Sequence, residues 1–366
     1  MIDALKKMDK KFLYIFGGVI ALLVIFVIFA VLVSMMGVAN LGYQQIEDKM
    51  VEATKSYVTK EKDLALDSGE YLVVSTETLV SKGYLKELSK YNKDECSGQV
   101  VVMNNNKLLN YIPQLNCSKY TTKTLVDKII EDNLVVDSQN PYQSGLYEQN
   151  GEYIFKGKSP NNYFSFGSSV VWRIIKIDAD GNIRLIKAEQ ETESPWDNKF
   201  NPETNSSSGK NEYRYSELRS RLINGYNGLK EENRRRLIPH DVCVGSRAIK
   251  DYTLSTNIDC SEILSDQYIS TLNTIELSMA SLDENCDSIR NGNCLNYNYF
   301  SGFVRRSWTT ISVSDNTYEA YTVSTGSISR YETRERHGYY WVVYLSGREV
   351  YKSGSGTKTD PYVLHK

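Results

Sequence analysis

The stretch from Phe12 to Met36 contains no charged residue. An α-helix rises ~1.5 Å per residue, and ~20 apolar residues cross the hydrocarbon core of a bilayer. The stretch is also longer than the ~7–15 apolar residues of a cleaved signal peptide. We therefore predict a transmembrane signal-anchor helix over residues 12–36, with the lipid bilayer as its partner.

Four lysines precede this stretch: Lys6, Lys7, Lys10 and Lys11. Positive charge near a transmembrane helix stays on the cytoplasmic side. We expect residues 1–11 to form a cytoplasmic basic tail and everything after Met36 to be extracellular, which gives a single-pass protein of the cell membrane. A buried core helix and cleavage after Ala39 are the two alternatives.

Six cysteines all follow the predicted anchor, as expected for an oxidising compartment. Local spacing favours three pairs: Cys96–Cys117, Cys243–Cys260 and Cys286–Cys294. The chain has no C-x-x-C pair, so we predict no zinc site and no other metal or cofactor. Unpaired buried thiols become the alternative if the predicted topology is wrong.

Residues 37–136 are predicted to form a small extracellular module of helices and a β-hairpin. Apolar residues recur at three- and four-residue steps from Tyr43 to Tyr57, which indicates a helix. Strands at 99–103 and 108–115 are expected to turn at 104–106, because Asn accepts the left-handed conformation. A further helix is expected at 124–133.

The polar segment 137–145 is predicted to be a linker, and residues 146–366 a second, α+β domain. We expect strands at 153–157, 170–177, 183–188 and 339–345. We expect helices at 216–229, 231–237 and 274–282, the first with Leu218, Leu222 and Tyr226 facing inward.

Composition excludes two classes of function. The net charge of −2 and the pI of 6.1 argue against nucleic acid, because phosphate binding requires a clustered basic surface. Three histidines and the lack of a G-x-S-x-G elbow leave no basis for a hydrolytic triad. We expect a protein that is not an enzyme.

Three runs carry a resemblance: 153–163 (YIFKGKSPNNY), 171–177 (VWRIIKI) and 354–363 (GSGTKTDPYV). They resemble a family of Gram-positive bacterial surface proteins that ends in a domain of unknown function. The resemblance implies a C-type-lectin-like fold, related to sulfatase-modifying factors, for the last part of the chain. The cysteine pair of those enzymes is missing after Cys294, and the calcium-ligand runs of C-type lectins are missing as well, so neither property is expected here.

The resemblance places the ligand-binding surface of such domains in late loops, here 308–336. Aromatic rings could stack on sugars or apolar groups, and arginines could pair with carboxylates or sulfates. The candidate ligand-binding residues are Trp308, Tyr318, Tyr321, Arg330, Tyr331 and Arg334. The alternative is that Trp308 and Tyr321 belong to the core and that the arginines form a solvated edge.

These observations together lead us to expect a membrane-anchored extracellular binding protein. An adhesin or receptor with a glycan, cell-wall or protein ligand fits this description. The alternative is a pilin-like or envelope assembly subunit, although Gly17-Gly18 is followed by Val19 and the span has no Glu, unlike a prepilin leader. The sequence leaves the ligand and the oligomeric state open.

Overall fold

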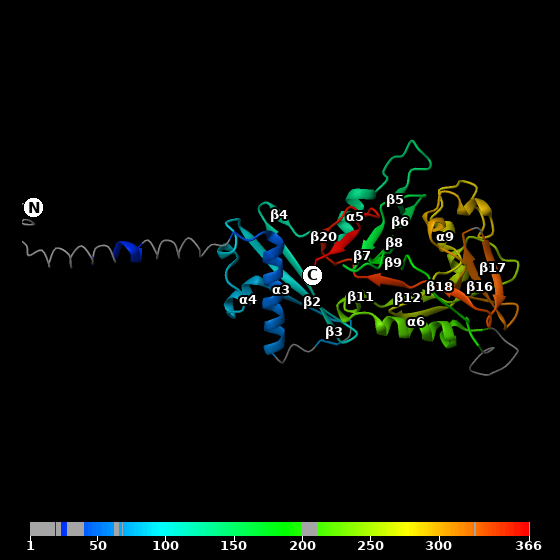
Figure 1. Ribbon diagram of the computed structural model, residues 1–366, viewed down its shortest axis with the longest axis horizontal. Coiled ribbons are helices and arrows are strands. Elements are labelled where there is room, and N and C mark those ends of the chain that lie inside the picture. The colour runs from blue at the N-terminus through cyan, green and yellow to red at the C-terminus, as the bar shows by residue number, and fades with distance from the viewer. Residues whose placement is uncertain are drawn as a thin grey trace, which may run out of the picture. The chain divides into compact units, whose positions relative to one another are not determined.

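Figure 1 shows the computed structural model, which describes residues 19, 23–27, 40–61, 66–67, 69–198, 211–325 and 327–365. The predicted cytoplasmic tail lies outside the described residues, as does most of the predicted transmembrane helix at 12–36. The described part of that helix, 19 and 23–27, is helical. Within the described part of the chain, no helix combines the length and the apolar character that crossing a membrane requires.

The chain is a mixed α+β protein with several sheets and three disulfides. It divides into two compact units. Unit 1 takes the described residues within Met1–Ala65, Val73–Val101 and Pro113–Thr121, and unit 2 takes those within Leu66–Leu72, Val102–Ile112 and Thr122–Lys366.

Unit 1 contains a long helix that approaches a β-strand closely at a glycine. A Cβ built on Gly98 would lie 2.7 Å from Cε of Met50 and 2.9 Å from the backbone carbonyl of Gln114, so a larger residue would force the strand or the helix to shift. The fully buried Ile46 and Met50 lie on the expected inward face. The elements that contribute to unit 1 form a sheet of order β1-β2-β3-β4 with two helices: α3 (Tyr43–Lys60), β1 (Tyr71–Ser75), α4 (Thr76–Ser81), β2 (Cys96–Asn105), β3 (Leu108–Cys117) and β4 (Tyr120–Thr121).

The hairpin between β2 and β3 turns later than predicted. Asn106 and Lys107 have φ of 51° and 65°, whereas 104–105 still belong to β2. Two successive residues with positive φ are typical of the tight turn whose twist matches that of the flanking strands. Three consecutive asparagines offered more than one place for this turn.

Unit 2 contains a nine-stranded sheet that joins strands from both ends of its sequence. In Figure 1 the red C-terminal segment, labelled β20, lies near the green strands of the same sheet, and its last strand β21 pairs with β7. The path is β11-β19-β9-β8-β7-β21-β20, with β6 paired to β8 and β5 to β6. The strands are β5 (Gly145–Gln149), β6 (Glu152–Lys156), β7 (Tyr163–Ser165), β8 (Trp172–Ile177), β9 (Ile183–Lys187), β11 (Leu237–Ile238), β19 (Val342–Leu345), β20 (Tyr351–Ser353) and β21 (Tyr362–Leu364).

Two smaller sheets complete the β-structure of unit 2. A six-stranded sheet follows the order β10-β18-β15-β16-β17, and β13 pairs with β15; β12 and β14 form a separate pair. These strands are β10 (Glu191–Ser194), β12 (His240–Cys243), β13 (Ser246–Arg247), β14 (Ile263–Gln267), β15 (Ser307–Val313), β16 (Glu319–Ser324), β17 (Ser327–Glu332) and β18 (His337–Tyr339). The prediction of a single strand over 339–345 is wrong. This run divides between β18 and β19, which belong to different sheets.

Two helices of unit 2, α5 and α6, begin at a capping side chain, and the helices predicted at 231–237 and 274–282 are shorter than predicted. Ser216 accepts a hydrogen bond from the amide of Arg219 and begins α6, whose Leu218, Leu222 and Tyr226 are buried as predicted. The helix predicted at 231–237 ends at Arg234, because Leu237 and Ile238 pair with β19 as β11. The helices are α5 (Leu125–Asn133), α6 (Glu217–Gly228), α7 (Glu231–Arg234), α8 (Thr256–Asp259) and α9 (Glu276–Met279).

Helix α5 was assigned above to the module before the linker, yet Leu125 and Ile129 belong to the core of unit 2. That core also holds Phe155, Leu185 and Val343 from three strands of the large sheet. The domain limits given above stay a prediction. For the site, the relevant feature is that the central strands β8 and β9 are buried along most of their length, and that Arg173 and Arg184 in these strands are buried.

Candidate functional site

A row of four residues crosses the large sheet and forms the floor of a cavity. Ile154 of β6 pairs with Lys176 of β8, Lys176 pairs with Arg184 of β9, and Arg184 pairs with Tyr344 of β19. Directly opposed residues of antiparallel strands project from the same face. All four residues line one cavity of about 180 Å³, which we call the inner chamber.

Two ion pairs line the inner chamber, and each includes one residue of this row. Lys176 Nζ lies 2.6 Å from Oε1 of Glu152, with both side chains about a quarter exposed. Arg184 Nη2 lies 2.6 Å from Oε1 of Glu276, and these side chains are only 9% and 8% exposed. Burial by itself lowers the pKa of the Arg184 guanidinium, but Glu276 and Tyr344 outweigh burial and hold the pKa above its usual value. Arg184 is therefore charged at every physiological pH.

The carboxylate of Glu276 is held in place by the turn that begins α9. Asn273 Oδ1 accepts the amides of Ile275 and Glu276, and the amide of Asn273 donates to Oε2 of Glu276 at 2.9 Å. This reciprocal bonding fixes the backbone of the turn and the side chain of Glu276 together. The ion pair with Arg184 is thus formed between two rigid elements.

The inner chamber continues into a second cavity of about 580 Å³, the outer chamber. The two chambers share five lining residues: Glu152, Ile154, Thr256, Ile275 and Met279. The outer volume falls within the ~300–1,000 Å³ that is usual for ligand pockets. We refer to the two together as the two-chamber cleft.

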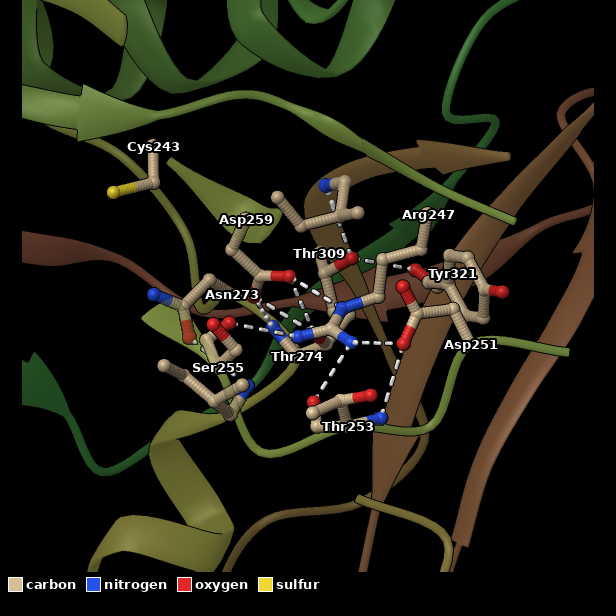
Figure 2. A network of polar contacts seen from close by, with 12 residues as sticks. Cys243, Arg247, Asp251, Thr253, Ser255, Asp259, Asn273, Thr274, Thr309 and Tyr321 are labelled. Atoms are coloured by element: carbon tan, nitrogen blue, oxygen red, sulfur yellow. Dashed lines mark hydrogen bonds and ion pairs between the residues drawn. The ribbon is translucent and has the colours of Figure 1, made fainter. Parts of the chain in front are cut away.

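A buried polar network anchors the walls of this cleft (Figure 2). Arg247 is fully buried, and its Nε donates to Asp259 Oδ1 at 2.5 Å. Its two terminal nitrogens donate to the carbonyls of Thr253 and Ser255 at 2.9 and 3.2 Å. Asp259 in turn accepts the amide of Thr274 at 3.0 Å and its hydroxyl at 2.7 Å.

Three chain segments meet at this ion pair: 253–256, 259–260 and 273–276. Each of them contributes lining residues to the cleft. A buried pair whose hydrogen-bonding groups are occupied in this way resists distortion, because a broken bond would leave a charge without a partner in the interior. The network therefore holds these wall segments together, although Arg247 and Asp259 themselves do not line the cleft.

Two disulfides reinforce the same walls. Cys243 and Cys260 both line the inner chamber and are bonded to each other, and Cys286 of the outer chamber is bonded to Cys294. The third disulfide joins Cys96 to Cys117 at the base of the β2–β3 hairpin. The structure thus contains the three pairs that local spacing favours, and three disulfides suggest an extracellular or secreted domain.

His240 lies behind the floor, beside Tyr344, with 4.4 Å between the ring centroids. Burial, and then the charge of Arg184, lower the pKa of His240 to about 3. Its imidazole is therefore neutral at neutral pH and adds no charge near the cleft. Among the described residues, no cluster of three His, Cys, Asp or Glu side chains is placed to hold a metal ion.

The six residues predicted from the late loops do not form one face. In strand β16, Ala320 pairs with Tyr331 and Tyr321 pairs with Arg330, so Tyr331 and Arg330 project from opposite faces. Trp308 pairs with Thr322 and shares the face of Tyr331. Because side chains alternate between the two faces of a strand, the candidate residues that lie in these strands are divided between the two faces of this sheet.

Two of the six are interior residues in this structure. Trp308 is 0% and Tyr321 is 1% exposed, and each donates a hydrogen bond to a backbone carbonyl, that of Ser194 and that of Ala248 respectively. Their rings face packed side chains, which leaves no surface on which a ligand could stack. The burial of Trp308 and Tyr321 agrees with the alternative given in the sequence analysis, that both residues belong to the core.

The other four lie nearer the surface. Tyr318 is 46% exposed, and Arg334 is exposed between β17 and β18. Arg330 Nη1 lies 3.1 Å from Oε2 of Glu319. The ring of Tyr331 contacts His337 at 4.4 Å between centroids, and the guanidinium of Arg306 lies 5.0 Å from the Tyr331 ring. The ligand-binding role of these residues stays a prediction.

The sequence did contain a signal for the cleft. Lys176 and Arg184 interrupt the apolar runs VVWRIIKI and IRLIKA, and a charged residue within a buried strand requires a partner. Their partners, Glu152 and Glu276, lie far from them along the chain. Only the strand register and the position of α9 bring these four charges into one cavity.

Comparison with protein-family models, with curated proteins and with solved structures finds no match to this chain.

Proposed function

We propose that this chain is a membrane-anchored, extracellular binding protein, not an enzyme, and that its ligand enters the two-chamber cleft. The observation that carries the proposal is the cleft itself. It is lined by two ion pairs, and its walls are fixed by two disulfides and by the Arg247–Asp259 network. A rigid concave site with a few fixed polar groups is the usual form of a binding site.

Several further features support the proposal. The cysteine pairing fits an extracellular protein, and the apolar stretch at 12–36 fits an anchor. The resemblance to Gram-positive surface proteins with a C-type-lectin-like domain points to the same class. Glycan, cell-wall and protein ligands are all compatible with that class.

The test is a binding screen of the full-length chain in detergent against glycans and cell-wall fragments, repeated with two variants. Met279 lines both chambers and is partly exposed, so Met279→Trp fills the cleft from an edge that tolerates a larger side chain. The double variant Tyr331→Ala/Arg334→Ala alters the surface at β17 instead.

We expect Met279→Trp to abolish binding, and Tyr331→Ala/Arg334→Ala to leave binding unchanged. Loss of binding only in the double variant would move the site to the β17 surface and overturn the assignment of the cleft. A folded chain that binds no glycan, cell-wall fragment or protein would overturn the binding function and favour an assembly subunit.

A further inference from the structure

The charges that line the inner chamber are balanced in pairs. Glu152 neutralises Lys176, and Glu276 neutralises Arg184. Asp241 also lines the chamber, but it is exposed, where solvent screens its charge. A charged ligand would meet no uncompensated opposite charge on the floor of the chamber.

One buried donor of a residue that lines the chamber has no partner among the described residues. Nη2 of Arg184 pairs with Glu276 and Nη1 donates to the Tyr344 hydroxyl at 3.3 Å, whereas no described residue accepts a hydrogen bond from Nε. An unsatisfied buried N–H destabilises the folded chain, and a charged group does so more strongly. The chamber that Arg184 lines is therefore suited to an acceptor atom beside this nitrogen.

A carboxylate would be a poor choice for that acceptor. It would compete with Glu276 for the guanidinium, and two carboxylates near one buried cation would leave one of them uncompensated. A hydroxyl does not raise this problem, because it accepts from a guanidinium N–H and at the same time donates to a carboxylate. Neighbouring hydroxyls on one ring can make both bonds within a single ion pair.

Part of the remaining lining supplies apolar surface, beside polar residues such as Thr271 and Thr310. Ile154, Ile175, Val242 and Ala280 present aliphatic groups, and Tyr344 adds an aromatic ring. A ligand with hydroxyls at its edge and C–H groups on its faces matches this combination.

We propose that the inner chamber binds a neutral sugar ring, whose hydroxyls bridge the Glu276–Arg184 and Glu152–Lys176 pairs. The inference rests on the proposed function and narrows its ligand to uncharged carbohydrate. The outer chamber would then hold the continuation of a longer glycan.

The test compares three probes that share one ring and differ in charge: glucose, glucuronate and glucosamine. Binding to the full-length chain in detergent is followed by ligand-observed NMR and calorimetry. We expect glucose to bind, and both charged analogues to bind more weakly. Tightest binding of glucuronate would overturn the inference in favour of a carboxylate ligand.

The variant Glu152→Gln/Lys176→Met removes one ion pair without changing net charge, at side chains that are 28% and 24% exposed. We expect it to weaken glucose binding about tenfold, which corresponds to about 1.4 kcal/mol, because the hydroxyls lose hydrogen bonds to a charged pair. The matched control is Asp132→Asn/Lys128→Met in α5, a pair of 2.7 Å with exposures of 23% and 24% outside the cleft lining. Thermal unfolding of both variants verifies that each is folded.

The two proposals fail in different ways. If no monosaccharide binds but peptides or cell-wall fragments bind in a manner that Met279→Trp abolishes, the cleft is a binding site and the sugar inference is wrong. If the control loses glucose binding as much as the cleft variant does, the effect is not local and the inference is also wrong. If nothing binds the cleft, both proposals fail.

Discussion

At the scale of single residues, charged side chains in buried strands distinguish this chain from an ordinary sheet protein. Arg173 and Arg184 both lie in the interior, but they are used differently. Arg173 Nε donates to Asn162 Oδ1 at 2.6 Å, and its guanidinium lies 3.8 Å from the Tyr163 ring centroid, a packed arrangement. Arg184 instead lines a cavity and keeps one N–H without a partner. Of these two arginines, Arg184 is therefore the one that belongs to the candidate binding cleft.

His240 yields a prediction about acid stability. Its pKa is lowered to about 3 in the folded chain, whereas an unfolded chain protonates histidine near pH 6.5. The unfolded state thus binds one more proton between these pH values, so stability falls as pH decreases below about 6.5, by at most about 1.4 kcal/mol per pH unit. The variant His240→Gln should show a shallower fall between pH 6.5 and 5 in denaturant titrations.

His337 provides the comparison for this experiment. Burial also lowers its pKa, but its side chain is partly exposed. His337→Gln should therefore change the pH dependence in the same direction and by less. Equal slopes for the wild-type chain and His240→Gln would show that His240 does not control acid stability.

At the scale of elements, two errors in prediction share one origin. The run 339–345 is apolar throughout, and so reads as a single strand, yet β18 pairs with β10 and β15 while β19 pairs with β9 and β11. In the same way, Leu237 and Ile238 continue a helical pattern but pair as a strand. In each case the secondary structure of the residues depends on the strand with which they pair, and the local sequence pattern does not reveal that strand.

The disulfide between Cys243 and Cys260 supports a prediction at this scale. The two residues are 17 apart in sequence, and closing a loop of this size stabilises the folded chain by ~3 kcal/mol in the chain-entropy model. Cys243→Ser/Cys260→Ser should lower the free energy of unfolding by about this amount and also weaken binding in the cleft, whose wall both residues form. Guanidinium titration and the binding screen measure the two effects.

The pair Cys96→Ser/Cys117→Ser is the control, because it opens a loop with a sequence separation of 21 that does not line the cleft. It should lower stability by a similar amount and leave ligand binding intact. If both double variants lost binding equally, the wall disulfide would have no specific role in the site.

At the scale of the whole molecule, the proposed topology is open to direct test. Carbonate extraction of membranes should leave the full-length chain in the pellet, because the apolar stretch 12–36 is proposed to span the bilayer. Protease added to intact cells should digest the region after residue 40 and leave a tag placed before residue 1 protected. Release by carbonate, or digestion of the N-terminal tag, would contradict the single-pass topology.

A chain in which residues 1–39 are replaced by a cleavable signal peptide serves as the control. It should be secreted, form the same three disulfides and retain ligand binding, because every residue of the cleft lies beyond position 148. Retention of this version in the membrane would show that another segment holds the chain there.

The sequence by itself determined the features that depend on near neighbours along the chain. Periodicity located α3, α5 and α6, and in the structure Thr124 and Ser216 accept backbone hydrogen bonds at the beginning of α5 and α6. Short spacing between cysteines also favoured the three disulfides, since the ends of a short loop meet at little entropic cost.

The tertiary structure alone decided the site. Ile154, Lys176, Arg184 and Tyr344 come from four strands spread over much of the chain, and their meeting depends on strand register. Register also placed Tyr331 and Arg330 on opposite faces and put Trp308 in the core. A shift of one residue reverses the face of every side chain in a strand, and composition does not reveal which register packs best. The elements could therefore be predicted from local pattern, whereas the cleft required the complete fold.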